Sequence, residues 1–435
     1  MPTASFHSLG CRLNQTEAAL WAGAFRQKGY AIVEWGEPSD LVVINTCSVT
    51  ERGEASCRNA IRQALRRRAD AFVVVTGCYA QVGLEALRSI EGVDMIVGTE
   101  YKDKFPAFID EPRKLPDPVV LHSKLIDDSD FEIQSTGYFQ TTRASLKVQD
   151  GCDFFCSFCI IPFTRGRERS RKLPDLLREA SELAQQGYQE LVLTGVNIGR
   201  YRYEGTTFDG MVGRLEELEG LRRIRITSIE PTTIESSLVA RMASSDKLCH
   251  YFHVPIQSGD GPVLEAMNRR YGPESYRAFV EEVLDRVPDV GLGTDVIVGF
   301  PGETDASFER TYALLESTPF AYFHVFSYSK RYGTRAARLS DRVSTETIKE
   351  RSHRLRDLSA KKKLAFARRF VGTEVEVLFE QQDENGLWTG LTGSYLRVGV
   401  VSSQPLRNQL RTVTVREAGS DLSLGVVSEA RTAAR

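Results

Sequence analysis

The sequence lacks the signals that carry a chain to or across a membrane. No run reaches the roughly eighteen unbroken apolar residues of a transmembrane helix. The first residues, MPTASFHSLGCRLNQ, do not join a positive charge to an apolar stretch as a secretory signal does. A large charge excess is also missing, since 56 basic and 58 acidic residues give a net charge of −2. Any surface for nucleic acid must therefore be local. A chain of 435 residues is expected to form a cytoplasmic protein of about two to four domains.

Disulfide bonds are not expected either. Eight cysteines without a secretion signal indicate a reducing compartment, where clustered cysteines bind metal more often than they form disulfides. Cys152, Cys156 and Cys159 lie in GCDFFCSFC at the spacing C-x3-C-x2-C. A structural zinc site needs four protein ligands, and no other cysteine or histidine lies nearby in the sequence. An iron–sulfur cluster held by three thiolates would leave one iron open to an exogenous ligand.

A second set of three cysteines lies in residues 1–110. This region alternates apolar runs with amphipathic segments, which is typical of an open, mostly parallel α/β sheet. Cys11, Cys47 and Cys78 each follow an apolar run, in HSLGC, LVVINTC and VVVTGC. Because the carboxyl ends of parallel strands share one edge, the three thiols are predicted to converge there. The alternative is three buried structural cysteines.

Other residues near these cysteines suggest supporting roles. Asn14 and Asn45 flank two of the thiols and are candidates to orient thiolates from the second layer of the site. Cys57 lies in a helical pattern and Cys249 precedes HYFHV. Neither has a partner at ligand spacing, so both are interpreted as structural.

Three regions follow the first. Residues 111–137 hold prolines and acids and are interpreted as a linker. Residues 138–370 contain six apolar runs separated by helical segments, which favours a partial (βα)6 barrel, although a doubly wound sheet gives the same pattern. Residues 371–435 alternate apolar and polar residues and predict a small all-β barrel. The expected fold class is therefore α/β multidomain, with an open parallel α/β sheet, a partial barrel and a small β-barrel.

The cysteine spacing after the first strand of the βα repeat, with Phe158 before the last cysteine, resembles that of radical S-adenosylmethionine (SAM) enzymes. The resemblance extends over nearly the whole chain to the methylthiotransferases, which join a three-cysteine domain, a radical SAM partial barrel and a C-terminal barrel called TRAM. Within this family the chain is most similar to the tRNA threonylcarbamoyladenosine enzymes, while close relatives modify isopentenyladenosine in tRNA or an aspartate of a ribosomal protein. Eight blocks occur in the family's order: GCRLNQTE, INTCSVT, TGCYAQ, GCDFFCSFCIIPFTRGRERSR, LTGVNIGRY, PIQSGDGPVLEAMNRRY, DVIVGFPGET and FSYSKRYGTRAA.

The resemblance implies methylthiolation at carbon 2 of N6-threonylcarbamoyladenosine, at position 37 next to the tRNA anticodon. It implies two 4Fe-4S clusters, through which the cysteines act in catalysis. The cluster on Cys152, Cys156 and Cys159 would bind SAM at its open iron and cleave it to a deoxyadenosyl radical. The auxiliary cluster, on Cys11, Cys47 and Cys78, would hold the sulfur that another SAM methylates. An electron donor such as flavodoxin or ferredoxin is implied as well.

The same resemblance suggests which residues bind SAM. Glycines and polar groups at the carboxyl ends of barrel strands approach a ligand closely. The second-strand motif LTGVN lacks the acid that many radical SAM enzymes carry, so the group that holds the SAM ammonium stays open. The candidates are Phe158, Gly195, Glu230, Gln257, Val298 and Gly299.

A basic stretch just after the second cysteine set is a candidate for contacting RNA phosphates. The alternative is an ordinary solvated charged surface. At the level of the whole protein, two further hypotheses stay open: a non-catalytic iron–sulfur RNA-binding protein, and a radical enzyme that modifies a protein side chain. The candidate RNA-binding residues are Arg165, Arg167, Arg169, Arg171 and Lys172.

Overall fold

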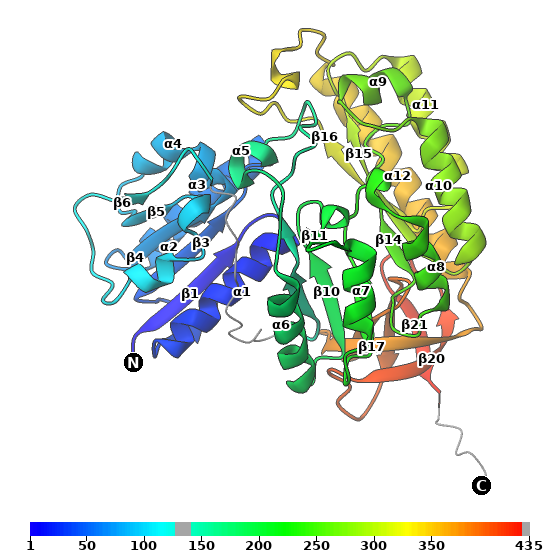
Figure 1. The fold of residues 1–435 in the computed structure, drawn as a ribbon, viewed down its shortest axis with the longest axis horizontal. Helices are drawn as coiled ribbons and strands as arrows, with labels where there is room; N and C mark the ends of the chain where they lie inside the picture. The colour runs from blue at the N-terminus through cyan, green and yellow to red at the C-terminus, as the bar shows by residue number, and fades with distance from the viewer. Residues whose placement is uncertain (127–140, 429–435) are drawn as a thin grey trace.

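The computed structural model describes residues 1–126 and 141–428. It confirms the expected fold class, with a parallel α/β sheet, a partial βα barrel and a small closed β-barrel (Figure 1). In this view the N-terminal sheet lies to the left of the partial barrel, and the C-terminal β-barrel lies beneath it. Among the helices of the described residues, none is both long and apolar enough to cross a membrane.

The N-terminal domain is a three-layer sandwich around a parallel sheet. Helix α1 (Arg12–Gln27) packs Trp21 and Phe25 on one face of the sheet, and α2 (Glu51–Arg67) packs Ile61 on the other. The central runs LVVINT and FVVVTG are buried along their whole length, as expected for parallel strands covered on both faces. In spatial order the strands are β2 (Ala31–Val33), β1 (Thr3–Ser8), β3 (Leu41–Thr46), β4 (Phe72–Gly77), β5 (Met95–Val97) and β6 (Val119–Leu121).

Strand β6 corrects the prediction that residues 111–137 form a linker. Val119–Leu121 pairs in parallel with β5 and extends the sheet by one edge strand. A run of three β-branched and aliphatic residues is too short to show a period in the sequence. It is ordered because β5 offers it unpaired backbone N–H and C=O groups. Residues 127–137 of the predicted linker lie outside the described residues.

The central domain holds six parallel strands in chain order. Its two three-stranded sheets are joined by parallel bridges from Ile224 to Leu248 and from Ser228 to His253. In the described part of the chain, β7 and β16 each pair with one strand only, so the barrel is open between them. The strands are β7 (Ala144–Lys147), β10 (Glu190–Thr194), β13 (Arg223–Ile226), β14 (Tyr251–His253), β15 (Gly291–Val298) and β16 (Tyr322–Ser327).

Amphipathic helices cover the outside of this barrel. Several begin at a side-chain cap: the hydroxyl of Thr304 accepts a hydrogen bond from the backbone N–H of Ser307, and that of Ser344 accepts one from Thr347. Such caps satisfy backbone donors that the first helical turn leaves unpaired. The helices are α5 (Ile161–Arg165), α6 (Leu173–Gln185), α7 (Phe208–Glu216), α8 (Ser236–Ser244), α9 (Gly261–Ala266), α10 (Pro273–Arg286), α11 (Asp305–Ser317) and α12 (Thr345–Arg368).

The C-terminal domain is a closed five-stranded barrel docked under the partial barrel. Buried Arg225 of β13 pairs with Glu190 of β10 and donates to the carbonyls of Thr392 and Gly393. One arginine therefore joins both barrels. In spatial order the strands are β17 (Glu374–Gln382), β18 (Leu387–Thr392), β19 (Arg397–Val401), β21 (Ser423–Val427) and β20 (Leu410–Glu417). Residues 429–435 of this predicted domain lie outside the described part of the chain.

Candidate active site

Three thiols of the N-terminal domain lie at one edge of its sheet. Cys11 follows β1, Cys47 follows β3, and Cys78 opens α3 (Cys78–Val82) directly after β4. These parallel strands are neighbours, so their carboxyl ends bring the three loops together. The thiols also interact electrostatically. Burial, together with nearby Cys78 and Cys11, raises the pKa of Cys47 to about 12.

A glycine precedes the cysteine in two of these loops because a side chain would not fit. Gly10 has a φ of +102°, and a Cβ there would lie 2.7 Å from Cβ of Cys47 and 2.8 Å from its sulfur. Gly77 has a φ of +94°, and its Cβ would lie 2.2 Å from the side-chain oxygen of Asn45. The Gly–Cys pairs therefore allow the loops to approach one another closely.

The two asparagines noted in the sequence have different roles. The side-chain oxygen of Asn14 lies 3.6 Å from the sulfur of Cys11, and its amide donates to the carbonyls of Leu9 and Thr46. Among the described residues, Asn45 makes no hydrogen bond to a thiol; its amide donates to the backbone carbonyl of Asn14 at 2.8 Å. Asn14 therefore orients the first cysteine, and Asn45 supports Asn14.

The second set of thiols lies on the loop after β7, at the carboxyl end of the barrel. Three contacts anchor this loop to the segment that follows α9. Ser157 N–H donates to the carbonyl of Met267 at 2.9 Å, and the amide of Asn268 donates to the carbonyls of Phe154 and Phe155. Burial, together with neighbouring Cys156, raises the pKa of Cys152 to about 11 and that of Cys159 to about 12. Three converging, partly buried thiols are a donor set suited to an iron–sulfur cluster.

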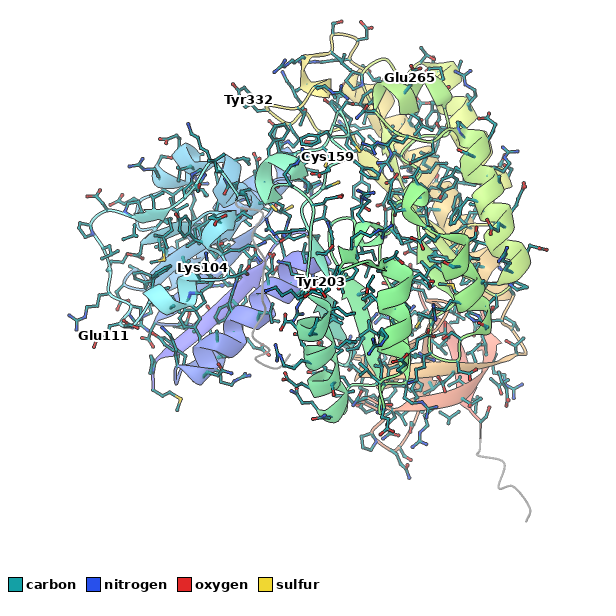
Figure 2. The ribbon with its side chains drawn as sticks, in the orientation of Figure 1. Lys104, Glu111, Cys159, Tyr203, Glu265 and Tyr332 are labelled. Atoms are coloured by element: carbon teal, nitrogen blue, oxygen red, sulfur yellow. The ribbon has the colours of Figure 1, made fainter. Side chains whose placement is uncertain are left out.

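The two sets of thiols face each other across a domain junction. Helix α5, which follows Cys159 almost directly, packs against α3, which begins at Cys78. Figure 2 shows Cys159 on the side of the barrel that faces the N-terminal domain. In the loop that follows β16, Arg331 donates a hydrogen bond to the carbonyl of Ser48 at 3.0 Å and pairs with Glu54 at 2.7 Å. The barrel segments that follow β7 and β16 therefore both contact the edge of the N-terminal sheet that carries the first set of thiols.

Two side-chain oxygens beside the second set lack hydrogen-bond partners within the described structure. One carboxylate oxygen of Glu230 pairs with Arg269 at 2.5 Å, while Oε1 is buried and unpartnered. Asn197 points its amide at the sulfur of Cys152, at 4.0 Å, while its Oδ1 is buried and unpartnered. Arg269 also donates to the sulfur of Cys156 at 3.2 Å. Buried acceptors without donors fit a polar ligand placed beside the thiols.

Sequence reasoning identified Glu230 but missed Asn197 and Arg269. Asn197 lies two residues after Gly195 in LTGVN, and Arg269 lies in the block ending MNRRY. Both motifs can be recognised in the sequence. The sequence does not show that the two segments lie next to the cysteine loop, where Asn197 contacts Cys152 and Arg269 contacts Cys156.

The remaining SAM candidates have contacts that narrow what each can do. Phe158 packs beside Ile297 and Phe300. A Cβ on Gly195 would lie 2.8 Å from the carbonyl oxygen of Gln149, so a glycine at this position allows the two backbone segments to pack closely.

The last three SAM candidates lie at the ends of later barrel strands. Gln257 has a φ of +67°, and the side chain of Val298 is buried in the barrel core. The N–H of Gly299 already donates to Glu303 at 3.1 Å.

Two of the predicted RNA-binding arginines do not face solvent. Arg165 has an exposed side-chain fraction of 2% and pairs with Glu17 and Asp150. Arg171 is fully buried and pairs with Asp175 and Glu179. The prediction that these two bind phosphate is therefore wrong, because their donors are already used on carboxylates inside the protein. Of the partners of Arg165, Glu17 lies 148 residues away in the sequence and Asp150 lies 15 residues away. Both partners of Arg171 lie on the next helix, α6.

The other three cations of that stretch differ in exposure. Arg167 has a side chain 59% exposed and lies 3.1 Å from Asp153. Arg169 is only 10% exposed and lies 3.5 Å from Asp150, and Lys172 is partly buried. Arg167 is thus the cation of this stretch most open to a partner.

Comparison with known proteins fits these sites. Residues 3–98 match the family described as Uncharacterized protein family UPF0004, and residues 146–315 match the Radical SAM superfamily. The chain is 36% identical to the threonylcarbamoyladenosine tRNA methylthiotransferase MtaB of Bacillus subtilis, covering 96% of this chain and 95% of that protein. The chain belongs to the radical SAM tRNA methylthiotransferase family. The protein of the same name from Aquifex aeolicus is 36% identical over 91% of this chain and 95% of its own length.

Other similar members of this methylthiotransferase family carry a second name. The tRNA-2-methylthio-N(6)-dimethylallyladenosine synthase of Thermoanaerobacter sp. is 34% identical over 94% of this chain and 89% of that protein. Among solved structures, the radical SAM methyltransferase TsrM from Kitasatospora setae superposes with a TM-score of 0.54 at 14% identity, covering 75% of this chain and 73% of that one. That likeness concerns the fold alone. Membership of the family means that this methylthiotransferase uses SAM and a 4Fe-4S cluster.

Proposed function

We propose that the protein methylthiolates carbon 2 of N6-threonylcarbamoyladenosine at position 37 of tRNA. The observation that carries this proposal is the pair of three-thiol sites facing each other at the junction of two domains. Its substrate rests on the 36% identity, over nearly the full length, to two proteins named for that nucleoside. A tRNA anticodon loop is the proposed macromolecular partner.

The second set of thiols would hold the cluster that binds SAM. Together the cluster and SAM supply the radical chemistry needed to replace a carbon–hydrogen bond that is neither acidic nor electrophilic. Cys152, Cys156 and Cys159 would bind three irons. Glu230 would accept a hydrogen bond from a ribose hydroxyl through its unpartnered Oε1. Asn197, with an unpartnered Oδ1 beside Cys152, would accept from the SAM ammonium, the group for which the sequence offered no ligand.

A second 4Fe-4S cluster would lie on Cys11, Cys47 and Cys78. The buried charges next to this site favour a thiolate cluster. Arg165 interacts electrostatically with both Cys78 and Cys11. Lys102 and Lys147 share Glu17 and Asp150 with Arg165, so three buried cations face two buried carboxylates. The excess positive charge stabilises anionic sulfur ligands.

Nucleoside analysis of tRNA tests this proposal. Deletion of the gene is expected to remove the 2-methylthio form of threonylcarbamoyladenosine and to leave the unmodified precursor. Complementation with the wild-type gene should restore the product, and the Cys156→Ala variant should not. An unchanged amount of the product in the deletion strain would rule out the proposed substrate.

A second candidate substrate is isopentenyladenosine, because relatives that are 34% identical carry that name. Loss of its methylthio form in the deletion strain would favour this alternative. The non-catalytic hypothesis makes a different prediction. Anaerobically reduced protein incubated with SAM would then form no 5′-deoxyadenosine, whereas the enzyme must form it.

A further inference from the structure

A cavity of 320 Å³ lies where the partial barrel is open. One wall comes from Arg143, which precedes the edge strand β7, and the other from Tyr322 and His324 on the opposite edge strand β16. Lys363 of α12 and the TRAM residues Tyr395 and Arg397 close it below. Its volume is within the range of about 300–1,000 Å³ typical of small-molecule sites. The cavity therefore lies between the open edge of the partial barrel and the C-terminal barrel.

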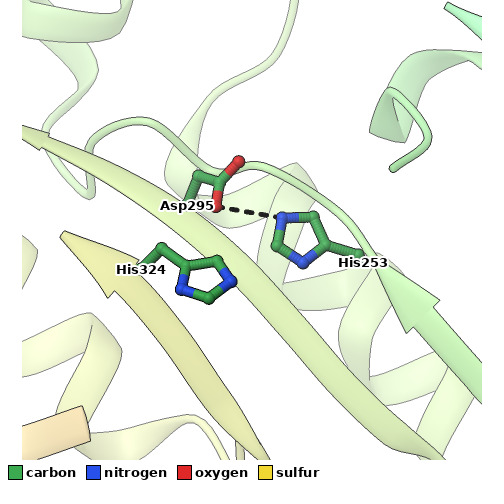
Figure 3. Close-up of side chains that lie close together, drawn as sticks. All are labelled: His253, Asp295 and His324. Atoms are coloured by element: carbon green, nitrogen blue, oxygen red, sulfur yellow. Dashed lines mark ion pairs between the residues drawn. The ribbon is translucent and has the colours of Figure 1, made fainter. Parts of the chain in front are cut away.

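A polar cluster inside the barrel borders this cavity. His253 of β14, Asp295 of β15 and His324 of β16 offer nitrogen and oxygen atoms that all lie within 4.8 Å of one another (Figure 3). His253 is buried and engaged on both ring nitrogens, with Nε2 at 3.0 Å from Oδ1 of Asp295 and Nδ1 at 3.0 Å from the hydroxyl of Tyr322. His324 is exposed, and no hydrogen bond joins its ring to another described residue. His253 is held by Tyr322, whereas buried Oδ1 of Asp295 has no hydrogen-bond partner in the described structure and His324 is left to meet a ligand.

The charges around His324 favour an anion. Arg143, Lys363 and Arg397 line the cavity, against Glu380 and Asp421. Arg143 pairs with Glu380 through Nε at 2.8 Å, and its buried Nη1 lies 3.9 Å from Glu190 without a hydrogen bond in the described structure. Lys363 makes only a loose, exposed pair with Asp421 at 3.4 Å. Arg397 is exposed and has no carboxylate partner among the described residues; it donates to the hydroxyl of Thr389 at 3.4 Å.

The cavity also lies at a suitable depth in the barrel. Asp295 pairs in register with His324, and Val298 pairs with Ser327 at the carboxyl end of the same two strands. Three residues of strand separate these pairs, which is roughly 10 Å. A purine placed below the SAM-binding end of the barrel could therefore direct its N6 substituent toward His324. Partial desolvation lowers the pKa of His324, so its neutral ring can donate one hydrogen bond and accept another.

We propose that the cavity formed by His324, Lys363, Arg397 and Arg143 binds the carboxylate and hydroxyl of the threonylcarbamoyl group on the target adenine. This inference rests on the proposed function and identifies the residues that select its substrate. Lys363 and Arg397 pair with the carboxylate, Arg143 adds positive charge beside it, and His324 contacts the hydroxyl. An isopentenyl group would leave these polar groups without partners, which is how a polar site rejects an apolar analogue.

Two matched anticodon stem-loops test the proposal. One carries N6-threonylcarbamoyladenosine, and in the other the threonyl carboxylate is replaced by a carboxamide. The reconstituted wild-type enzyme should bind the carboxylate form at least about tenfold more tightly and show a correspondingly lower KM, as expected for a charge-assisted hydrogen bond. His324→Phe, Lys363→Met and Arg397→Gln should each reduce this preference. Lys361→Met, on the exposed face of the same helix as Lys363, should not.

Each alternative result has a definite meaning. Equal binding and equal KM for the two stem-loops would overturn the inference and leave the proposed function standing. An enzyme that methylthiolates only an isopentenyladenosine stem-loop would overturn both. One equivalent of zinc or iron beyond the clusters, lost from His253→Ala and His324→Ala alike, would overturn the inference in favour of a metal site on His253, Asp295 and His324.

Discussion

Arg165 donates a hydrogen bond of 2.6 Å to the side-chain oxygen of Asn14, which lies 151 residues away in the sequence. Asn14 in turn contacts the sulfur of Cys11, and Arg165 lies in the helix that follows Cys159. One arginine therefore connects the two candidate cluster sites. Burial alone would raise the pKa of Glu17, but Arg165 and two lysines hold it well below its usual range.

Replacing Arg165 with methionine should destabilise the protein. The change removes the buried ion-paired hydrogen bonds that Arg165 donates to Glu17 and Asp150, and breaking a buried ion pair in this way costs about 3–5 kcal/mol. The free energy of unfolding from denaturant titration measures the effect. Arg167→Met removes a largely exposed cation and should cost about 0–1 kcal/mol. Equal losses in the two variants would contradict the structural role of Arg165.

The iron content should divide between the two sets of cysteines. Protein reconstituted anaerobically should hold about eight irons if each set carries a four-iron cluster. Replacing Cys152, Cys156 and Cys159 with alanine should remove about half of that iron, and replacing Cys11, Cys47 and Cys78 should remove the other half. Cys249→Ala, a buried thiol outside both sets, should retain all of it. Full iron content in the second triple variant would refute an auxiliary cluster.

Gly10→Ala should empty the auxiliary site alone. The added Cβ would press on Cβ and sulfur of Cys47, and the backbone φ of +102° adds strain. Gly29→Ala is a matched control, because Gly29 has a φ of +87° but no atom within 4 Å of the new Cβ. Iron analysis should show about half the wild-type content in Gly10→Ala and the full content in Gly29→Ala. Retention of all iron by both variants would show that the close approach of Gly10 is unimportant.

Glu230→Gln should weaken SAM binding. The substitution keeps the shape of the side chain but removes its negative charge. That charge pairs with Arg269 and would strengthen the hydrogen bond accepted from a ribose hydroxyl. Loss of a hydrogen bond to a charged group predicts a rise in Kd of roughly 10- to 100-fold. Equilibrium dialysis with reconstituted protein measures it. Glu235→Gln, on the surface near the same strand, is the control and should bind SAM as the wild type does.

Acid should weaken the joint between the two barrels. Burial alone would raise the pKa of Glu190, but Arg225, Arg143 and Arg223 lower it below its usual value. A carboxylate with a lowered folded-state pKa stabilises the fold above its unfolded pKa of about 4.3 and loses that contribution as pH falls. Glu190→Gln should be less stable at pH 7 and decline less steeply between about pH 5 and 3. A decline as steep as that of wild type, or of the exposed control Glu219→Gln, would refute this role.

The sequence predicted the fold class and the grouping of the cysteines because both follow from short-range patterns. Apolar periods identify strands and helices, and a cysteine after each of several parallel strands must lie at the shared edge. The basic stretch after Cys159 was misread for the opposite reason. Whether Arg165 meets solvent or Glu17 depends on how two domains pack, and no local pattern records that. The three-residue strand β6 was not predicted because it is too short to show an apolar period. It forms a strand because it pairs with β5.

The buried network of ion pairs around Arg165 limits how the N-terminal domain and the barrel can be separated or exchanged. Glu17 and Lys102 belong to the N-terminal domain, whereas Lys147, Asp150 and Arg165 belong to the barrel. Either domain expressed alone would expose its part of this network without the partners from the other domain. A chimera that grafts another N-terminal domain onto this barrel would need to bring an acid and a base at the matching positions. The two domains are therefore expected to be inherited and exchanged as one unit.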